Sequence, residues 1–168
     1  LPFGNYEVNI TVPADHIMDG TGVITNRKEV YSAEMMKRFE QAKRSFDKPV
    51  IIVSQEEATK AESGFSEQKK TWKFKAEMVR DFAFATSRKF VVDMMNVDVM
   101  GKDVMAISMY PKEGNPLWEE YSTRAVASTL KTYSNHTFQY PYHKAISVHA
   151  KNQGMEYPMI CWNYGRPE

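Results

Sequence analysis

Strict alternation of apolar and polar residues is the feature that most constrains how this chain can fold. Residues 5–13 (NYEVNITVP) and residues 70–79 (KTWKFKAEMV) both alternate in this way. A period of two puts every second side chain on the same face of an extended strand, so each segment predicts a strand with one buried face. Pro13 ends the first strand. Residues 21–26 (TGVITN) are expected to form its short neighbour, after a turn at Asp19–Gly20.

Further strands are predicted before residue 112. The short apolar segment 50–53 and residues 81–87 (DFAFATS) indicate two of them. Two apolar runs, 90–100 and 104–110, are separated by residues 101–103 (GKD), which are typical of a hairpin connection. The first 112 residues therefore predict a mostly antiparallel sheet structure. Residues 59–70 are mostly polar and show no clear helix or strand pattern, and we expect a mobile surface loop there.

Three segments change to the helical period. Residues 33–46 place apolar side chains three and four positions apart, with Ser32 as the expected N-cap and Pro49 barring continuation. Residues 54–57 (SQEE) carry a capping-box pattern that predicts a short second helix. A third helix is expected from Asn115, its cap, with Pro116 at the first helical position, to about Asn135. A strand follows in residues 140–150 (YPYHKAISVHA).

This change from strands to a helix and then strands predicts a domain boundary, with one unit in residues 1–113 and a second in residues 114–168. The fold class is α+β, mainly β. The 168 residues can bury a real core. A formal net charge of +1 provides no global field that would attract nucleic acid, so no nucleic-acid partner is expected. No run of 18 apolar residues occurs, so no membrane segment is expected either.

Few residues offer chemistry. The histidines lack the local spacing of metal ligands, neither H-E-x-x-H nor C-x-x-C occurs, and we interpret the histidines as surface or rim residues. They are His16, His136, His143 and His149. Cys161 lies in an apolar strand and is interpreted as a small buried hydrophobe. No metal ligand and no catalytic residue is therefore predicted in this chain.

The remaining candidate is the loop 153–158 (QGMEYP). Gly154 allows the backbone to turn or to approach a ligand closely, and Pro158 keeps Tyr157 extended. Glu156 stands at the start of an apolar strand, where a carboxylate is suited to hold a cation such as an amine. The residues themselves leave two alternatives open: an amine-binding acid or a solvated loop acid.

A resemblance to a known family adds to this interpretation. Residues 154–158 (GMEYP) resemble the Gly-x-Met-Glu-Asn motif of the aminopeptidase-N family of zinc metallopeptidases, the gluzincin aminopeptidases. Residues 6–26, 71–90 and 140–150 resemble three further blocks of that family, in the same order, so the likeness covers nearly the whole chain. The sequence departs from the motif at Gln153, where the family has glycine, and at Tyr157, where it has asparagine.

The resemblance implies a saddle-like antiparallel sheet domain with a helical insertion, followed by the first helix and strands of a thermolysin-like catalytic domain. It implies that Glu156 binds the free α-amine of a peptide substrate, with Gly154 and Met155 forming the loop beside it. The family's zinc ligands lie downstream of the motif. We therefore expect an internal fragment of a zinc aminopeptidase, inactive alone, with zinc in the parent protein and none in this chain.

The expected partners are a peptide with a free amino terminus and the remainder of the parent protein. The alternative is a non-enzymatic β-sheet module that binds a peptide or protein partner, so whether the chain belongs to an enzyme stays open. The compartment is also open, with secreted and periplasmic locations among the alternatives.

Overall fold

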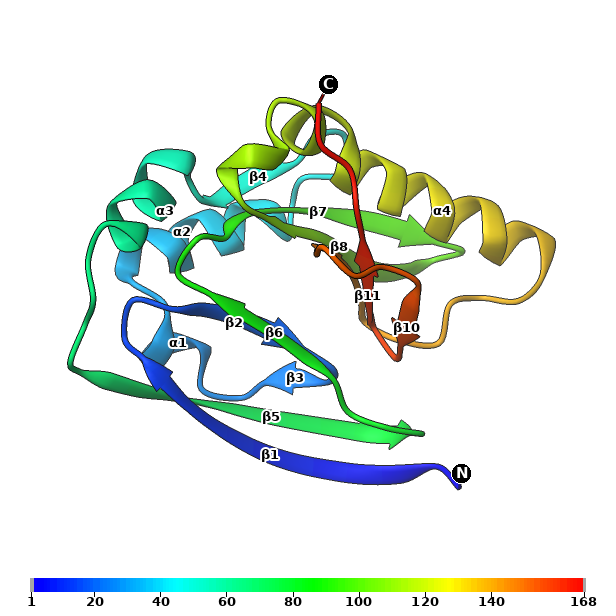
Figure 1. Cartoon of the computed structure of the whole chain (residues 1–168). Coiled ribbons are helices and arrows are strands. Elements are labelled where there is room, and N and C mark those ends of the chain that lie inside the picture. The colour runs from blue at the N-terminus through cyan, green and yellow to red at the C-terminus, as the bar shows by residue number, and fades with distance from the viewer. Residues whose placement is uncertain (1, 168) are drawn as a thin grey trace.

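Two long antiparallel strands form the layer that carries the alternating sequence (Figure 1). In the computed structural model, which describes residues 2–167, β1 (Gly4–Pro13) pairs with β5 (Lys69–Val79) over nearly its whole length. Trp72 and Phe74 of β5 are buried, whereas Lys73 between them is exposed. The alternation therefore predicted the strand correctly, and its buried face as far as Ala76. Met78, expected on that face, is 66% exposed, because the backbone turns there at a φ of +52° and Val79 is buried instead.

The third strand of this layer is not where the sequence predicted it. β3 (Val23–Ile24) pairs with β5, so the order is β1-β5-β3 and residues 21–26 do not pair with the first strand. The chain leaves the layer after Pro13, because β2 (Ile17–Gly20) pairs with β6 (Phe84–Ser87) instead. It returns through Gly22, whose φ of +87° and close approach to the backbone of Lys75 exclude a larger residue.

The largest sheet in residues 2–167 has six strands in the order β10-β11-β9-β8-β7-β4. Their bounds are β4 Val50–Val53, β7 Val91–Val99, β8 Lys102–Tyr110, β9 Lys144–His149, β10 Met155–Tyr157 and β11 Ile160–Asn163. β7 and β8 form the predicted hairpin, with Gly101 in its turn at φ +84°. The pairs β8–β9 and β9–β11 are parallel, whereas β10 and β11 pair antiparallel, so the sheet is mixed beyond residue 112.

The first two predicted helices form, with their expected caps. The described helices are α1 Arg27–Val30, α2 Ala33–Ala42, α3 Gln55–Glu62 and α4 Thr123–His136. Ser32 caps α2, and Ser54 makes both hydrogen bonds of a capping box with Glu57. α3 continues to Glu62 because Ala58 packs into the core, and β5 begins at Lys69. The loop expected over residues 59–70 is therefore wrong for half of its length, and residues 63–68 connect α3 to β5.

The third helix begins less regularly than the sequence predicted. A short 3-10 turn (Lys112–Gly114) precedes it, and a π-helical turn, η2 (Trp118–Ser122), leads into α4. Asn115 still caps this region, because its Oδ1 accepts a hydrogen bond from the backbone N–H of Glu119 at 3.3 Å. α4 ends at His136, one residue from the predicted end.

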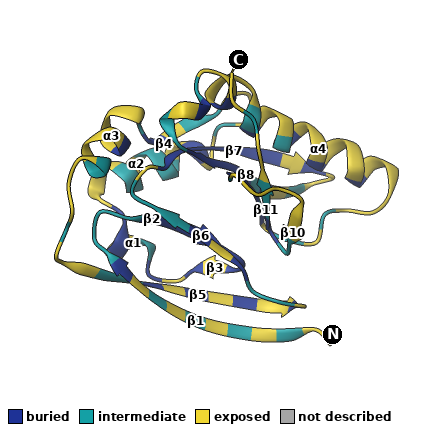
Figure 2. Cartoon of the chain, in the orientation of Figure 1, coloured by how far each residue is buried: buried dark blue, intermediate teal, exposed yellow. Residues whose placement is uncertain are grey.

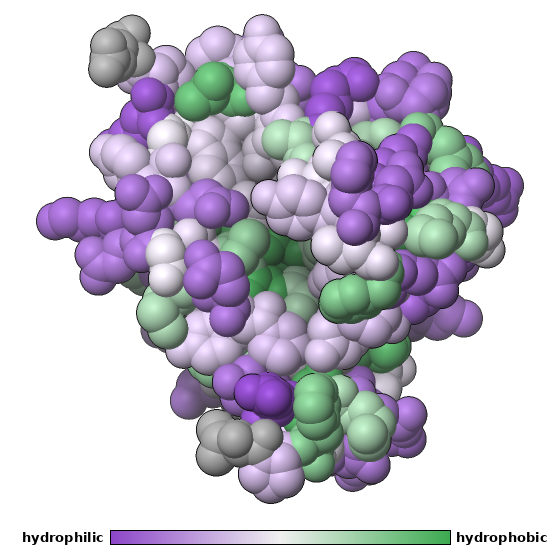
Figure 3. Space-filling model, turned by 90° about the vertical axis from the view of Figure 1, so that its right-hand side faces the viewer, coloured by the Kyte–Doolittle hydropathy of each residue, from purple (hydrophilic) through white to green (hydrophobic). Residues whose placement is uncertain are grey.

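The six-stranded sheet lies between two layers. α4 packs against β7 and β8 on one face, where Leu130 and Ala127 join the apolar side chains of these strands. On the other face, the larger core joins the sheet to α2 and to the strands of the lower layer. β7 and β8 are buried almost throughout, whereas α4 is exposed along its outer side (Figure 2). Viewed from the right of Figure 1, the molecule is hollowed, with hydrophobic side chains at the bottom of the hollow (Figure 3).

A buried ion pair connects two of the sheets. Lys144 Nζ of β9 lies 2.6 Å from Asp19 Oδ1 of β2, and the two side chains are 3% and 2% exposed. Burial is the largest effect on Lys144 and lowers its pKa, while the carboxylate of Asp19 opposes that change. The pair therefore joins β2 directly to β9 of the six-stranded sheet.

The sheet also bears on the predicted boundary at residues 113–114. Strands β4, β7 and β8 come from before it, and β9, β10 and β11 from after it. Residues on both sides of the boundary thus build one continuous sheet. The division into residues 1–113 and 114–168 stays a prediction.

Candidate functional site

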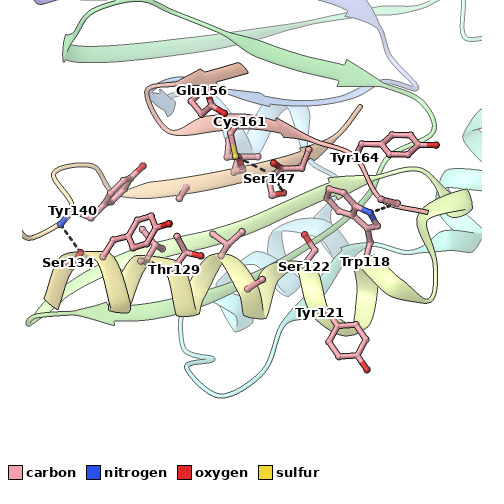
Figure 4. A pocket seen from close by; sticks show the side chains of 18 of the residues that line it. Trp118, Tyr121, Ser122, Thr129, Ser134, Tyr140, Ser147, Glu156, Cys161 and Tyr164 are labelled. Atoms are coloured by element: carbon pink, nitrogen blue, oxygen red, sulfur yellow. Dashed lines mark hydrogen bonds between the residues drawn. The ribbon is translucent and has the colours of Figure 1, made fainter. Parts of the chain in front are cut away.

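A cleft of about 800 Å³ lies between η2 and α4 on one side and strands β9 to β11 on the other (Figure 4). Aromatic and aliphatic side chains form most of its walls. Its lining includes Leu117, Trp118, Tyr121, Val126, Leu130, Tyr133, Phe138, Tyr140 and Tyr164. Among the described lining residues, Glu156 alone is an acidic or basic side chain. A concave and mostly apolar site with few polar groups is typical of ligand-binding sites.

The register of the sheet aligns five polar side chains in one row. Asp93 of β7 is the register partner of Ser108 of β8, which is the partner of Ser147 of β9. Ser147 in turn is the partner of Cys161 of β11, and Cys161 of Glu156 of β10. Register partners in neighbouring strands point to the same face. The row therefore crosses the face that α4 covers in part, from a buried carboxyl to the exposed Glu156.

Hydroxyl groups connect the covered half of this row to the helix. Thr123 Oγ1 donates to Ser108 Oγ at 2.7 Å, and Ser108 Oγ donates to Ser122 Oγ, also at 2.7 Å. Ser108 and Thr123 are buried, whereas Ser122 is half-buried and lines the cleft. Ser122 is the last residue of the π-helical turn, so that irregular turn places the end of the chain of hydroxyls in the cleft.

The uncovered half of the row has its own hydrogen bonds. Asn163 Nδ2 donates to Ser147 Oγ at 2.7 Å and lies 3.4 Å from Cys161 Sγ. The thiol of Cys161 donates to the carbonyl of Ile146. Burial raises the pKa of Cys161, the hydrogen bond from Asn163 lowers it, and the nearby Glu156 raises it again. Cys161 is half-buried and faces the cleft, so the prediction of a buried hydrophobe is only partly right.

Asp93 is buried at the inner end of the row. Tyr110 donates a hydrogen bond to its Oδ2 at 2.7 Å, and its Oδ1 has no hydrogen-bond partner among residues 2–167. Burial raises the pKa of Asp93 to about 7, against smaller opposite effects of Thr123 and Tyr110. Burial thus favours the protonated form, because a neutral carboxyl costs less free energy to bury than a carboxylate does.

The predicted loop lies at the outer end of the row. Gly154 has a φ of +83° and turns the chain into β10, as expected of a glycine there. Glu156 is exposed and lines the cleft. Met155 is also exposed but is not among the lining residues, because neighbouring residues of a strand point to opposite faces. The structure thus places one of the three predicted residues directly in the cleft.

An aromatic cluster closes one end of the cleft. The ring of His149 lies 5.1 Å from that of Trp118 and 5.5 Å from that of Tyr164, centroid to centroid. Trp118 Nε1 donates to the carbonyl of Gly165 at 2.7 Å. His149 is 7% exposed, and burial lowers its pKa. The interpretation of His149 as a surface or rim residue is therefore wrong, because the face of β9 that carries it is covered by Trp118.

Metal-ligating groups do not gather in this structure. Within residues 2–167, no three His, Cys, Asp or Glu side chains lie together in a way that could hold a metal ion. Residues of this part of the chain therefore do not fit a zinc site. Over the same range, no helix is both long and apolar enough to cross a membrane.

Sequence reasoning missed most of the row. Asp93, Ser108 and Ser147 are polar residues flanked by apolar neighbours within buried strands, which is the signal that could have identified them. A polar side chain in such a strand needs a hydrogen-bond partner, and strands with such residues at matching register could share a site. Ser122 gave no such signal, because it lies among polar residues of a helix.

Comparisons with known proteins give a likeness at the level of fold. No family model and no curated protein matches the sequence. Solved structures of M1 zinc metallopeptidase do match. One, a point mutant from Deinococcus radiodurans, has a TM-score of 0.54 and 13% identity over 93% of this chain and 29% of that chain. A mutant of a two-domain M1 zinc metallopeptidase bound to L-tryptophan has a TM-score of 0.53 at 13% identity, with the same coverage.

A third match is a mutant of the Deinococcus radiodurans enzyme bound to a Tyr-Ser-Ala substrate. Its TM-score is 0.52 at 12% identity, over 96% of this chain and 30% of that chain. This chain thus spans less than a third of the length of each of these structures. At such identity the likeness concerns the fold, which resembles a region of an M1 peptidase.

Proposed function

We propose that this chain is part of a zinc aminopeptidase and that its cleft holds the free amino terminus of a peptide at Glu156. One observation carries the proposal: the single acidic or basic side chain among the described lining residues is a carboxylate, set at the rim of an otherwise apolar cleft. A carboxylate in such surroundings favours an ammonium group, and charge-assisted hydrogen bonds are the stronger kind. The likeness to M1 zinc metallopeptidases supports this assignment at the level of fold.

The end of the sheet sets where a bound peptide would begin. β10 is the last strand of the order, so Glu156 lies at the outer end of the cleft. We propose that the peptide runs inward from there, across the face of the sheet that lines the cleft. We propose that Gly154 and Met155 form the loop beside the bound amine, with Gly154 supplying the turn that brings Glu156 to the rim.

We propose that the zinc site of the parent enzyme lies outside residues 2–167. A zinc ion in a peptidase polarises the carbonyl group and activates water. The described residues do not fit it, since they contain no cluster of three candidate ligands. We propose that the remainder of the parent protein supplies that site, and that this chain contributes substrate binding. Amine recognition needs only Glu156 and the cleft walls.

A binding experiment tests the role of Glu156. Isothermal titration calorimetry would compare Ala-Ala-Ala with its N-acetylated form on the wild-type chain and on Glu156→Gln. A charge-assisted hydrogen bond contributes about 1.5–3 kcal/mol, so we expect the free amine to bind about tenfold tighter to the wild type, and this preference to vanish in Glu156→Gln. Glu120→Gln, an exposed acid outside the lining, is the matched control. Equal binding of both peptides to the wild type would remove the amine-binding role.

The alternative is a non-enzymatic β-sheet module that binds a peptide or protein partner. Such a module would use the same cleft and Glu156 to bind its partner. Both proposals share the peptide-binding cleft and differ in what surrounds it. Reading the gene beyond residue 168 distinguishes them: H-E-x-x-H within a few tens of codons supports the enzyme, and its lack supports the module.

A further inference from the structure

Two hydroxyl groups in the cleft have a hydrogen to donate and no acceptor for it. Ser122 Oγ accepts from Ser108, and Ser147 Oγ accepts from Asn163. Neither hydroxyl donates a hydrogen bond to any group in residues 2–167. A serine hydroxyl carries one donor and two acceptor sites, so each of these two serines has its donor left over. Both line the cleft, and a ligand there can supply the acceptor.

Ser122 receives a hydrogen bond from the buried side. Thr123 donates a hydrogen bond to Ser108, and Ser108 donates one to Ser122, which lines the cleft. The two upstream hydroxyls belong to buried residues and have no access to bulk water. Ser122 thus accepts from Ser108 and keeps its own hydrogen for a ligand in the cleft.

The two donors lie close to each other. Ser108, which holds Ser122, is the register partner of Ser147 on the neighbouring parallel strand. Neighbouring strands are roughly 5 Å apart, so the hydroxyls of Ser122 and Ser147 approach one point from the helix and from the sheet. In the close view, Ser122 points from the helix toward the strand that carries Ser147 (Figure 4). One oxygen atom, or the two oxygens of a carboxylate, can accept from both.

The row also sets the distance to Glu156. Ser147 lies on β9 and Glu156 on β10, with β11 between them, so the two positions are two strand spacings apart, or roughly 10 Å. An extended peptide covers at most roughly 3.3–3.6 Å per residue. A peptide whose amino terminus is at Glu156 therefore brings the carbonyl or carboxylate oxygen of about its third residue to the two serines.

We propose that Ser122 and Ser147 form an acceptor-binding subsite that holds a carbonyl or carboxylate oxygen of a peptide, about three residues from its amino terminus. This inference rests on the proposed role of Glu156 and adds a length preference to it. The cleft selects ligands with an ammonium group at one end and an oxygen acceptor roughly 10 Å away. Tripeptides and longer peptides satisfy both ends at once, whereas single amino acids and plain alkylamines satisfy only one.

Two probes separate the subsite from the amine site. Ala-Ala-Ala carries both the ammonium group and the acceptors, and n-octylamine carries only the ammonium group on an apolar chain. Calorimetry would measure both on the wild type, Ser122→Ala, Ser147→Ala and Glu156→Gln. Thr129→Val is the matched control, because Thr129 lines the same cleft and makes no side-chain hydrogen bond within residues 2–167. Thermal unfolding of each variant checks that the fold is retained.

We expect Ser122→Ala and Ser147→Ala each to weaken Ala-Ala-Ala about fivefold, the effect of one hydrogen bond of about 1 kcal/mol, and to leave n-octylamine unchanged. Glu156→Gln should weaken both probes, and Thr129→Val neither. If the serine variants weaken neither probe, or both equally, the subsite is refuted while the role of Glu156 stands. If Glu156→Gln weakens neither probe, the proposed function fails. If neither probe binds the wild type, both proposals are overturned.

Discussion

Replacing Asp93 by asparagine should change how the stability of the protein depends on pH. The carboxyl is 1% exposed, and burial raises its pKa from 3.8 to about 7. The folded state therefore holds this proton more tightly than the unfolded chain does. The stabilising contribution is complete below about pH 4 and is lost as the pH rises through about 7.

The pKa difference sets the size of the effect. A difference of about three units corresponds to about 4 kcal/mol of free energy of unfolding, which is an upper limit between pH 4 and pH 8. Tyr110, Glu119 and Arg124 are the titratable or charged groups that act on Asp93 from neighbouring elements. Asparagine imitates the protonated carboxyl, because it is neutral, has nearly the same shape, and its oxygen can accept from Tyr110.

Urea unfolding followed by tryptophan fluorescence would measure this effect at several pH values between 4 and 8. The wild type should lose stability relative to Asp93→Asn as the pH rises, by a few kcal/mol over the range. Asp103→Asn, an exposed acid on β8 without a side-chain hydrogen bond in residues 2–167, is the control and should follow the wild type. A difference between wild type and Asp93→Asn that stays constant with pH would refute a protonated Asp93.

Two further predictions concern the buried ion pair and the metal. Asp19→Leu leaves the ammonium group of Lys144 buried without its partner and should cost about 3–5 kcal/mol in urea unfolding, most of which Lys144→Met in the same chain should restore. A double variant as unstable as Asp19→Leu would show that packing, not charge, carries the effect. The purified 168-residue chain mixed with zinc should hold no stoichiometric metal and hydrolyse no aminoacyl chromogenic substrate; turnover with one zinc per chain would contradict the proposed division of labour.

The parts of the fold that the sequence predicted are those with a local physical cause. The alternation around Trp72 and the turn at Gly101 depend on neighbouring residues, and both formed as expected. The cap at Ser54 is local as well. The partner of residues 21–26 depends on where β2 goes after Pro13, which is a long-range property. The alternation of apolar and polar residues predicts which face of a strand is buried, but it does not predict which strand pairs with it.

The candidate site divides in the same way. Glu156 was recognisable because the residues that shape its loop, Gly154 and Pro158, are adjacent in the sequence. The subsite was not recognisable, because Ser122 and Ser147 come from a helix and a strand whose relation is set by the β8–β9 crossover. Its donors also depend on buried partners, which a sequence does not reveal. Sequence reasoning therefore found the outer end of the polar row and missed the inner end.

The position of the row on the sheet explains why some of its polar side chains are open to a ligand. α4 covers β7 and β8 and only part of β9, so the same row is buried at Asp93 and open at Glu156. Small side chains at Ser147 and Cys161 leave space beside α4 that larger residues would fill. A buried polar group must find its partners within the protein, whereas one at the edge of the covered region can leave a donor for another molecule. The two serines stand at this edge, which is why their hydrogens are available to a ligand.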